Sequence, residues 1–232
     1  MKHLKLQATA DAPDAMDITD HLRDGILSGL FAPHSPLRID ALATQFQVSH
    51  MPIREALRRL ESEGLLDSVP NRGSRVVAVT PAFVADIFDL RSLVEAFMTR
   101  RAAERITAQQ LAELQVVQTR YEAAAQSQDV AAALAANRAF HSAINNIAGN
   151  RDGSLILDRH WRLISALWRV YGYQTDRFEA VISDHRQLLA ALAEHDGEAA
   201  AALSAAHSMR AKQTLLQRMR QKLDAGDQKA SA

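Results

Sequence analysis

The chain has 232 residues, of which 47% are hydrophobic and 23% charged, and its 27 basic and 27 acidic side chains give a formal net charge of zero. The length suits two domains, and no apolar run approaches the roughly 20 residues of a membrane span, so we expect no membrane association. The absence of cysteine excludes disulfides and thiolate metal sites. Aspartates interrupt residues 11–20, where a secretion signal needs an apolar segment, so a cytoplasmic location is expected.

Three helices are predicted in the first part of the chain. Apolar residues recur at helical spacing from Ile18 to Leu30, and a second short helix covers residues 40–46. A third helix begins at Ser49, whose hydroxyl is expected to accept a hydrogen bond from the first turn, and Pro52 is tolerated in that turn. The apolar stripe of this third helix is Ile53, Ala56, Leu57 and Leu60.

A β-hairpin is predicted behind these helices. Two short runs of β-like composition, residues 65–69 and 75–79, flank residues 70–74, whose asparagine and glycine permit a tight turn. From Thr80 onward, helix start signals and periodicity indicate about six helices and no strand. The predicted fold class is therefore mainly α, with a winged helix-turn-helix followed by an all-α helical bundle.

The first part of the chain contains a long ordered motif. Its members are Gly25-Ile-Leu, Leu42-Ala43, Val48-Ser49, Pro52-Ile-Arg-Glu-Ala-Leu57, Arg59-Leu60-Glu61, Glu63-Gly64-Leu65 and Arg72-Gly73. Through these residues the segment 25–79 resembles the GntR family of bacterial transcription regulators. His50 stands where that family usually has arginine, and Gln47 replaces a common turn glycine. The resemblance implies that the third helix enters the major groove of double-stranded DNA with its first turn.

The implied DNA contacts lie on the third helix and the wing. Arg54 projects from the exposed side of the first turns and can reach a guanine edge or a phosphate. The other implied contacts are Ser49, His50, Met51 and Pro52 at the helix tip and Arg38, Arg58, Arg72 and Gly73 against phosphates. For each arginine the alternative is a solvated charge or an intrahelical pair, such as Arg58 with Glu61. Because the net charge is zero, DNA binding requires that acidic and basic residues lie on different faces.

Three histidines in the second part of the chain are expected to converge. Asn137 and His141 are four residues apart and share a helix face, while His185 and His207 fall on the apolar stripes of two other helices. Neutral imidazoles with an amide or carboxylate oxygen suit a divalent zinc, nickel or manganese ion. The alternative for each inward histidine is a hydrogen-bonded core residue.

A second resemblance covers this part of the chain. Arg91 with Glu95, Ala102-Ala103, Asn137 with Phe140-His141, Gly149-Asn150, His185, Asp196 and His207 recur in the order of the FCD effector domain of FadR-like regulators. The resemblance implies a metal site, with Asn137 standing where aspartate is common. It also implies that Arg91 binds the carboxylate of a small organic acid; its alternative is a helical pair with Glu95.

These patterns predict a dimeric, effector-controlled transcription regulator and not an enzyme. The expected segments are a flexible tail at 1–16, a DNA-binding domain at 17–79, a ligand-binding and dimerisation domain at 80–224 and a flexible tail at 225–232. A homodimer is expected to bind a palindromic operator. The residues do not distinguish repression from activation, and we expect repression. Two rivals are a metal-dependent hydrolase, for which no HExxH, GxSxG or P-loop motif is present, and an adaptor whose winged helix binds protein.

Overall fold

The chain divides into two compact units, Met1–Val79 and Thr80–Ala232. The structure is a computed structural model, and it describes residues 15–69 and 73–230. Both units have their own fully buried apolar side chains, such as Ile18 and Leu60 in the first and Phe140 and Leu188 in the second. No helix among the described residues is long and apolar enough to cross a membrane.

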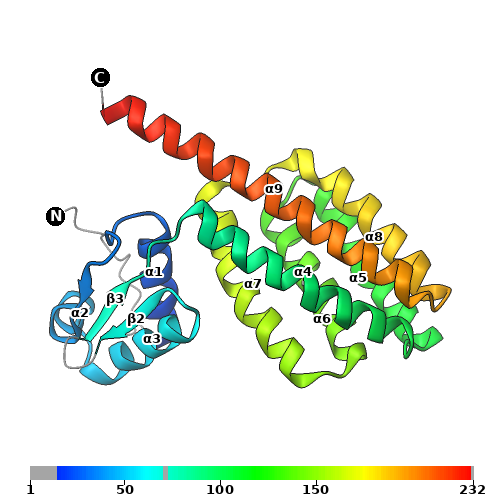
Figure 1. Cartoon of the computed structure of the whole chain (residues 1–232), viewed down its shortest axis with the longest axis horizontal. Helices are drawn as coiled ribbons and strands as arrows, with labels where there is room; N and C mark the ends of the chain where they lie inside the picture. Colours follow the sequence, from blue (N-terminus) through cyan, green and yellow to red (C-terminus); the bar gives the residue numbers. More distant parts are fainter. Residues whose placement is uncertain (1–14, 70–72, 231–232) are drawn as a thin grey trace. The chain divides into compact units, whose positions relative to one another are not determined.

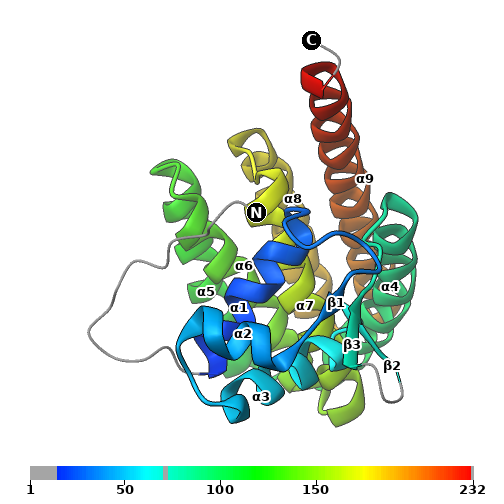
Figure 2. The same ribbon diagram turned by 90° about the vertical axis from the view of Figure 1, so that its left-hand side faces the viewer.

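The first unit consists of helices packed beside a small sheet, which Figure 2 shows from a second side. Its described elements are α1 (Ala15–Leu27), β1 (Pro36–Leu37), α2 (Ile39–Phe46), α3 (His50–Ser62), β2 (Leu66–Val69) and β3 (Gly73–Val76). The apolar face of α3 is buried at Ile53, Ala56, Leu57 and Leu60, as predicted. These buried side chains hold α3 against α1 and α2, which leaves the opposite face of α3 exposed.

The sheet is antiparallel with the order β1-β3-β2. Leu66 pairs with Val76 and Val69 pairs with Gly73, which confirms the predicted hairpin, although β3 ends at Val76 and not at residue 79. Strand β1 was not predicted. It is only two residues long and starts at a proline, so it has no periodicity that a sequence could show.

The connection between α2 and α3 is tight. Gln47 ends α2 in the left-handed region, with φ 57° and ψ 40°, at the position where a turn glycine was expected. Ser49 is the N-cap of α3, but its side chain makes no capping hydrogen bond, so that part of the prediction is wrong. The free hydroxyl of Ser49 therefore stays at the exposed tip of the helix.

A buried ion pair joins helix α1 to the C-terminal end of α3. Arg23 on α1 donates from Nε to Glu63 Oε2 at 2.7 Å and from Nη2 to Glu63 Oε1 at 2.8 Å. The two side chains are only 5% and 3% exposed. Glu63 is the C-cap residue of α3, so this bidentate contact fixes the end of α3 against α1.

The described part of the second unit forms six α-helices and one 3-10 turn, without a strand. They are α4 (Pro81–Ala103), α5 (Ala108–Gln126), α6 (Val130–Ala148), α7 (Arg151–Tyr171), η1 (Thr175–Arg177), α8 (Phe178–Ala193) and α9 (Gly197–Ala230). Thr80 caps α4 by accepting from Phe83 N, and Thr107 forms the capping box with Gln110, as predicted. Helix α9 extends to Ala230, beyond residue 224, where a flexible tail was expected to begin.

The helices of this unit pack into a bundle around apolar side chains. Helix α9 runs alongside α4, and Thr99 on α4 donates to Ser204 on α9 at 3.0 Å (Figure 1). The largest core cluster includes Met98, Phe140 and Leu188 from three different helices. The predicted fold class, a winged helix-turn-helix followed by a helical bundle, is confirmed.

Candidate nucleic-acid interface and metal centre

The first turns of α3 present an exposed polar surface. Arg54 and Arg58, one helical turn apart, are both exposed, and neither forms an ion pair with a described residue. At the tip, Met51 is 63% exposed, and Ser49 and His50 are also exposed. The described residues predicted to contact DNA on this helix therefore share the side of α3 that faces away from the core, with Pro52 half-buried beside them.

Neighbouring acidic side chains are partly removed from this surface. Glu63 is buried against Arg23, and Glu61 accepts a hydrogen bond from Ser74 Oγ at 2.6 Å, so Glu61 does not serve as the helical partner of Arg58. The Nε2 atom of His50 lies 3.4 Å from Oδ1 of Asp40, and both side chains are exposed. Two of the acidic side chains near the arginines are thus engaged within the unit, while Asp40 and Glu55 stay exposed, so the surface around α3 carries charges of both signs.

Two of the remaining predicted DNA contacts, Arg38 and Gly73, lie next to or within the strands of the sheet. Arg38 is exposed at the N-cap of α2. Gly73 opens β3 with φ +77°, a left-handed conformation that favours glycine. Arg72, the predicted wing contact, lies outside the described residues.

Three buried histidines meet inside the second unit. His141 from α6, His185 from α8 and His207 from α9 each offer a nitrogen, and these atoms all lie within 4.8 Å of one another. The ring centroids are 5.1 to 5.3 Å apart in the three pairs. The predicted convergence of three helix faces is therefore observed.

Polar neighbours fix the orientation of two of these rings. His207 donates from Nδ1 to Asp184 Oδ2 at 2.9 Å, and Asp184 also accepts from Arg210. The Nδ1 of His185 lies 2.7 Å from Gln118 Oε1 and donates to it. With Nδ1 protonated, each ring presents the lone pair of Nε2, which is the arrangement that supports metal ligation.

Burial keeps His141 and His185 neutral. Burial lowers the pKa of His141 to about 3, although the nearby carboxylate of Glu95 acts in the opposite direction. Burial, together with the neighbouring His207 and His141, also lowers the pKa of His185 well below its usual range. A neutral imidazole carries the lone pair that a metal ion needs.

The donor set fits a divalent metal ion. His185 Nε2 and Asn137 Oδ1 are both buried and have no hydrogen-bond partner in the described part of the chain. Asn137 lies one turn before His141 on α6 and lines the same pocket. Three imidazole nitrogens and one amide oxygen match the ligands that zinc, nickel and manganese accept.

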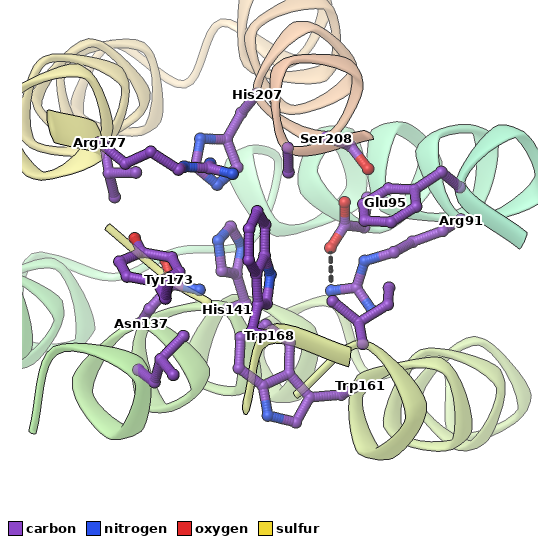
Figure 3. A pocket seen from close by; sticks show the side chains of 15 residues that line it. Arg91, Glu95, Asn137, His141, Trp161, Trp168, Tyr173, Arg177, His207 and Ser208 are labelled. Atoms are coloured by element: carbon purple, nitrogen blue, oxygen red, sulfur yellow. Dashed lines mark hydrogen bonds and ion pairs between the residues drawn. The ribbon is translucent and has the colours of Figure 1, made fainter. Parts of the chain in front are cut away.

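A small cavity of about 30 Å³ is lined by His141 and His207. Arg91 lines it but is already paired, since its Nη2 donates to Glu95 Oε1 at 2.5 Å (Figure 3). A second arginine, Arg177, also lines the cavity. Sequence reasoning missed Arg177, Gln118 and Asp184. Asp184, directly before His185, had a readable signal, because carboxylates often orient metal-ligating histidines.

Comparisons with known proteins agree with this two-part architecture. Residues 15–76 match the family of bacterial regulatory proteins, gntR family, and residues 86–211 match the FCD domain. The chain is 29% identical over 199 residues to the HTH-type transcriptional repressor RspR of Escherichia coli strain K12, covering 84% of this chain and 86% of RspR. It is 26% identical over 191 residues to the regulator YdhC of Bacillus subtilis, covering 81% and 84% of the two chains.

A solved structure has a similar fold. The structure of McbR/YncC from E. coli superposes with a TM-score of 0.68 at 25% identity, covering 88% of this chain and 98% of McbR/YncC. The matched families and named relatives are transcription regulators, which confirms the prediction that the chain is not an enzyme and excludes the hydrolase alternative. The chain belongs to the GntR family of bacterial transcription regulators, with a GntR DNA-binding domain followed by an FCD domain.

Proposed function

We propose that this regulator is a metal-containing repressor whose operator binding is controlled by a small organic acid in the FCD domain. The observation that carries the proposal is the set of three buried histidines whose nitrogens lie within 4.8 Å of one another. Repression is supported by RspR, whose name describes a repressor. The effector shifts the equilibrium between DNA-binding and non-binding states through its different affinity for the two.

His141, His185, His207 and Asn137 would hold the metal. When bound, the ion supplies a Lewis-acidic positive charge to an anionic ligand. The chain's own residues prepare this site: Asp184 and Gln118 hold the imidazoles of His207 and His185 by their Nδ1 atoms, and burial keeps His141 and His185 unprotonated.

The metal is tested by its removal. Purified protein should contain about one divalent ion per chain, and chelation should lower its melting temperature; a ligand present at about a hundred times its Kd stabilises the folded state by roughly 2.7 kcal/mol. His207→Gln should lose the metal, and its melting temperature should no longer respond to chelator. Elemental analysis and thermal unfolding provide the two readouts.

The matched control is His34→Gln, because His34 is an exposed histidine in the other unit. This variant should keep both the metal and the response to chelator. Wild-type protein that is purified without metal and gains no stability from zinc, nickel or manganese would contradict the metal site.

We also propose that the chain is a homodimer that binds a palindromic operator. The support is an apolar surface on α4, where Leu90, Leu93 and Phe97 are 60%, 69% and 51% exposed. Their spacing of three and four residues places them on one helix face. Leu155 and Ile156 on α7 are also exposed, and the 3.4 Å contact from Arg91 Nη1 to the Leu157 carbonyl joins the two helices at this level.

Such a surface is costly to expose and is typical of an interface. A two-fold dimer buries the same patch on both copies and places two reading helices on two half-sites. Leu93→Glu should therefore convert the protein from a dimer to a monomer in light scattering, because it places a charge in the middle of the patch. Val116→Glu, at an apolar α5 residue that is 54% exposed, is the control and should stay dimeric. A Leu93→Glu protein that keeps the mass of two chains would refute this interface.

A further inference from the structure

Arg177 is a buried arginine at the end of η1, directly before α8. Only 9% of the residue is exposed. Its guanidinium lies over two aromatic rings, with Cζ 4.9 Å from the centroid of Trp168 and 5.4 Å from that of Tyr173. Figure 3 shows the side chain extending toward His207, and Arg177 lines the same cavity as that histidine.

The guanidinium of Arg177 has no anionic partner among the described residues. Its Nη1 atom is buried without a hydrogen bond. The two nearby carboxylates are engaged elsewhere, since Asp184 accepts from Arg210 and His207 while Asp176 lies 3.5 Å from Arg218. Burial lowers the pKa of Arg177, so the cost of removing its charge from water is larger than the compensation from its neighbours.

This situation differs from that of the other buried arginines. Arg23 is paired with Glu63, and Arg91 is paired with Glu95. The aromatic faces beneath Arg177 offset part of its desolvation cost, but they leave its Nη1 donor unsatisfied. Buried charges in proteins are paired or bind an ion, so the missing partner of Arg177 is best supplied by an anion from solution.

The space around Arg177 indicates the size and polarity of that partner. The cavity beside it, about 30 Å³, has room for a few atoms only. A wider groove of about 680 Å³ lies next to it and shares four lining residues with it, namely Leu134, Trp161, Trp168 and Tyr173. The groove adds apolar residues of α6, including Val130 and Ala131. A small anionic group fits beside Arg177, and an apolar body fits against the shared aromatic wall.

We propose that Arg177, rather than the already paired Arg91, binds the carboxylate of the effector, and that the effector is a carboxylic acid with an apolar body. The inference rests on the proposed function in taking this pocket as the effector site. It assigns Arg177 a specificity role: its charge selects an anion, and Trp168 and Tyr173 orient the guanidinium toward the cavity.

The test compares Arg177→Met with wild type in thermal unfolding and calorimetric titration. Methionine keeps the apolar packing on the two rings but carries no charge. Without ligand, the variant should melt at the same or a higher temperature, because a buried unpaired charge has been removed. The probes are hexanoate, phenylacetate and benzoate; at least one should stabilise wild type, and its Kd should rise by about tenfold to a hundredfold in the variant, the range for a hydrogen bond to a charged group.

Controls separate this role from a structural one. Arg120→Met, at an exposed arginine on α5, should respond to the probes like wild type. A large fall in the melting temperature of ligand-free Arg177→Met would identify Arg177 as a structural residue and overturn the proposal. Unchanged affinity for the stabilising probe in Arg177→Met, or no response of wild type to any of the three probes, would overturn it too. Acetate that stabilises as much as the larger acids would overturn the apolar body.

Metal analysis of the same samples distinguishes failure of this inference from failure of the metal site. Arg177→Met should retain its metal, since Arg177 is not among the four ligand candidates. If wild-type protein contains no metal but still binds the probe through Arg177, the proposed metal site is refuted and the role of Arg177 is supported. If the protein contains metal but its affinity for the probe is the same with and without Arg177, the role of Arg177 is refuted and the metal site is supported.

Discussion

Glu63→Gln is expected to destabilise the first unit by about 3–5 kcal/mol, the usual cost of breaking a buried ion pair from one side. The change keeps the shape of the side chain but removes the buried bidentate carboxylate, so Arg23 keeps only its pair with the more exposed Asp20 on its own helix. Because a small domain has only modest stability, this loss should unfold much of the DNA-binding unit near physiological temperature. Thermal and urea unfolding of the full chain should show an early transition, and operator binding should fail at the same temperature.

Two further variants make this result specific. Glu55→Gln removes an exposed carboxylate from the same helix and should leave stability within about 0.5 kcal/mol of wild type. The double variant Arg23→Met with Glu63→Leu should recover most of the lost stability, since apolar replacement of a whole buried pair is often neutral. A Glu63→Gln protein as stable as wild type would show that the pair does not hold α3 against α1.

Arg54→Ala is expected to have the largest effect on DNA binding. Loss of an arginine contact to a base edge costs about 1–3 kcal/mol and relaxes specificity at that base pair. A two-fold dimer loses the contact at both half-sites, so the total is about 2–6 kcal/mol. Gel shifts with DNA from upstream of the gene, repeated over a range of salt concentrations, measure both affinity and specificity.

The comparison with Arg58→Ala gives this prediction its control. Arg58 is interpreted as a phosphate contact, so its loss should weaken binding to all sequences alike and reduce the salt slope by about one per site. Arg120→Ala, in the other unit, should change neither quantity. Affinity that is independent of both Arg54 and salt would favour the alternative in which the winged helix binds a protein.

Much of the fold of both units could be predicted because local signals and the core pattern agree. The apolar stripe of α3 and the start signals at Thr80 and Thr107 are encoded within a few neighbouring residues. The pair of Arg23 and Glu63 could not be predicted, because the two residues are 40 positions apart and only packing of α1 against α3 brings them together.

The candidate metal site was also largely predictable, and its surroundings were not. His141, His185 and His207 each lie on an apolar helix face, so each points inward by its own periodicity. The environment of Arg177 depends instead on rings from the end of α7 and the following turn. In the sequence, Arg177 looks like any other arginine near the start of a helix. Only the folded bundle shows that its charge is buried.

Helix α4 has one face that lines the pocket and another that is apolar and exposed. Arg91 and Glu95 are buried toward the pocket, whereas Leu90, Leu93 and Phe97 point outward on the apolar surface. A helix turns as a rigid rod, so a rotation about its axis that suits a ligand on one side must displace the apolar side chains on the other. Only residues 77–80 separate this rod from the end of β3. In the dimer and effector site proposed above, α4 is therefore the helix that touches both the ligand pocket and the second copy, and only four residues of chain join it to the DNA-binding unit.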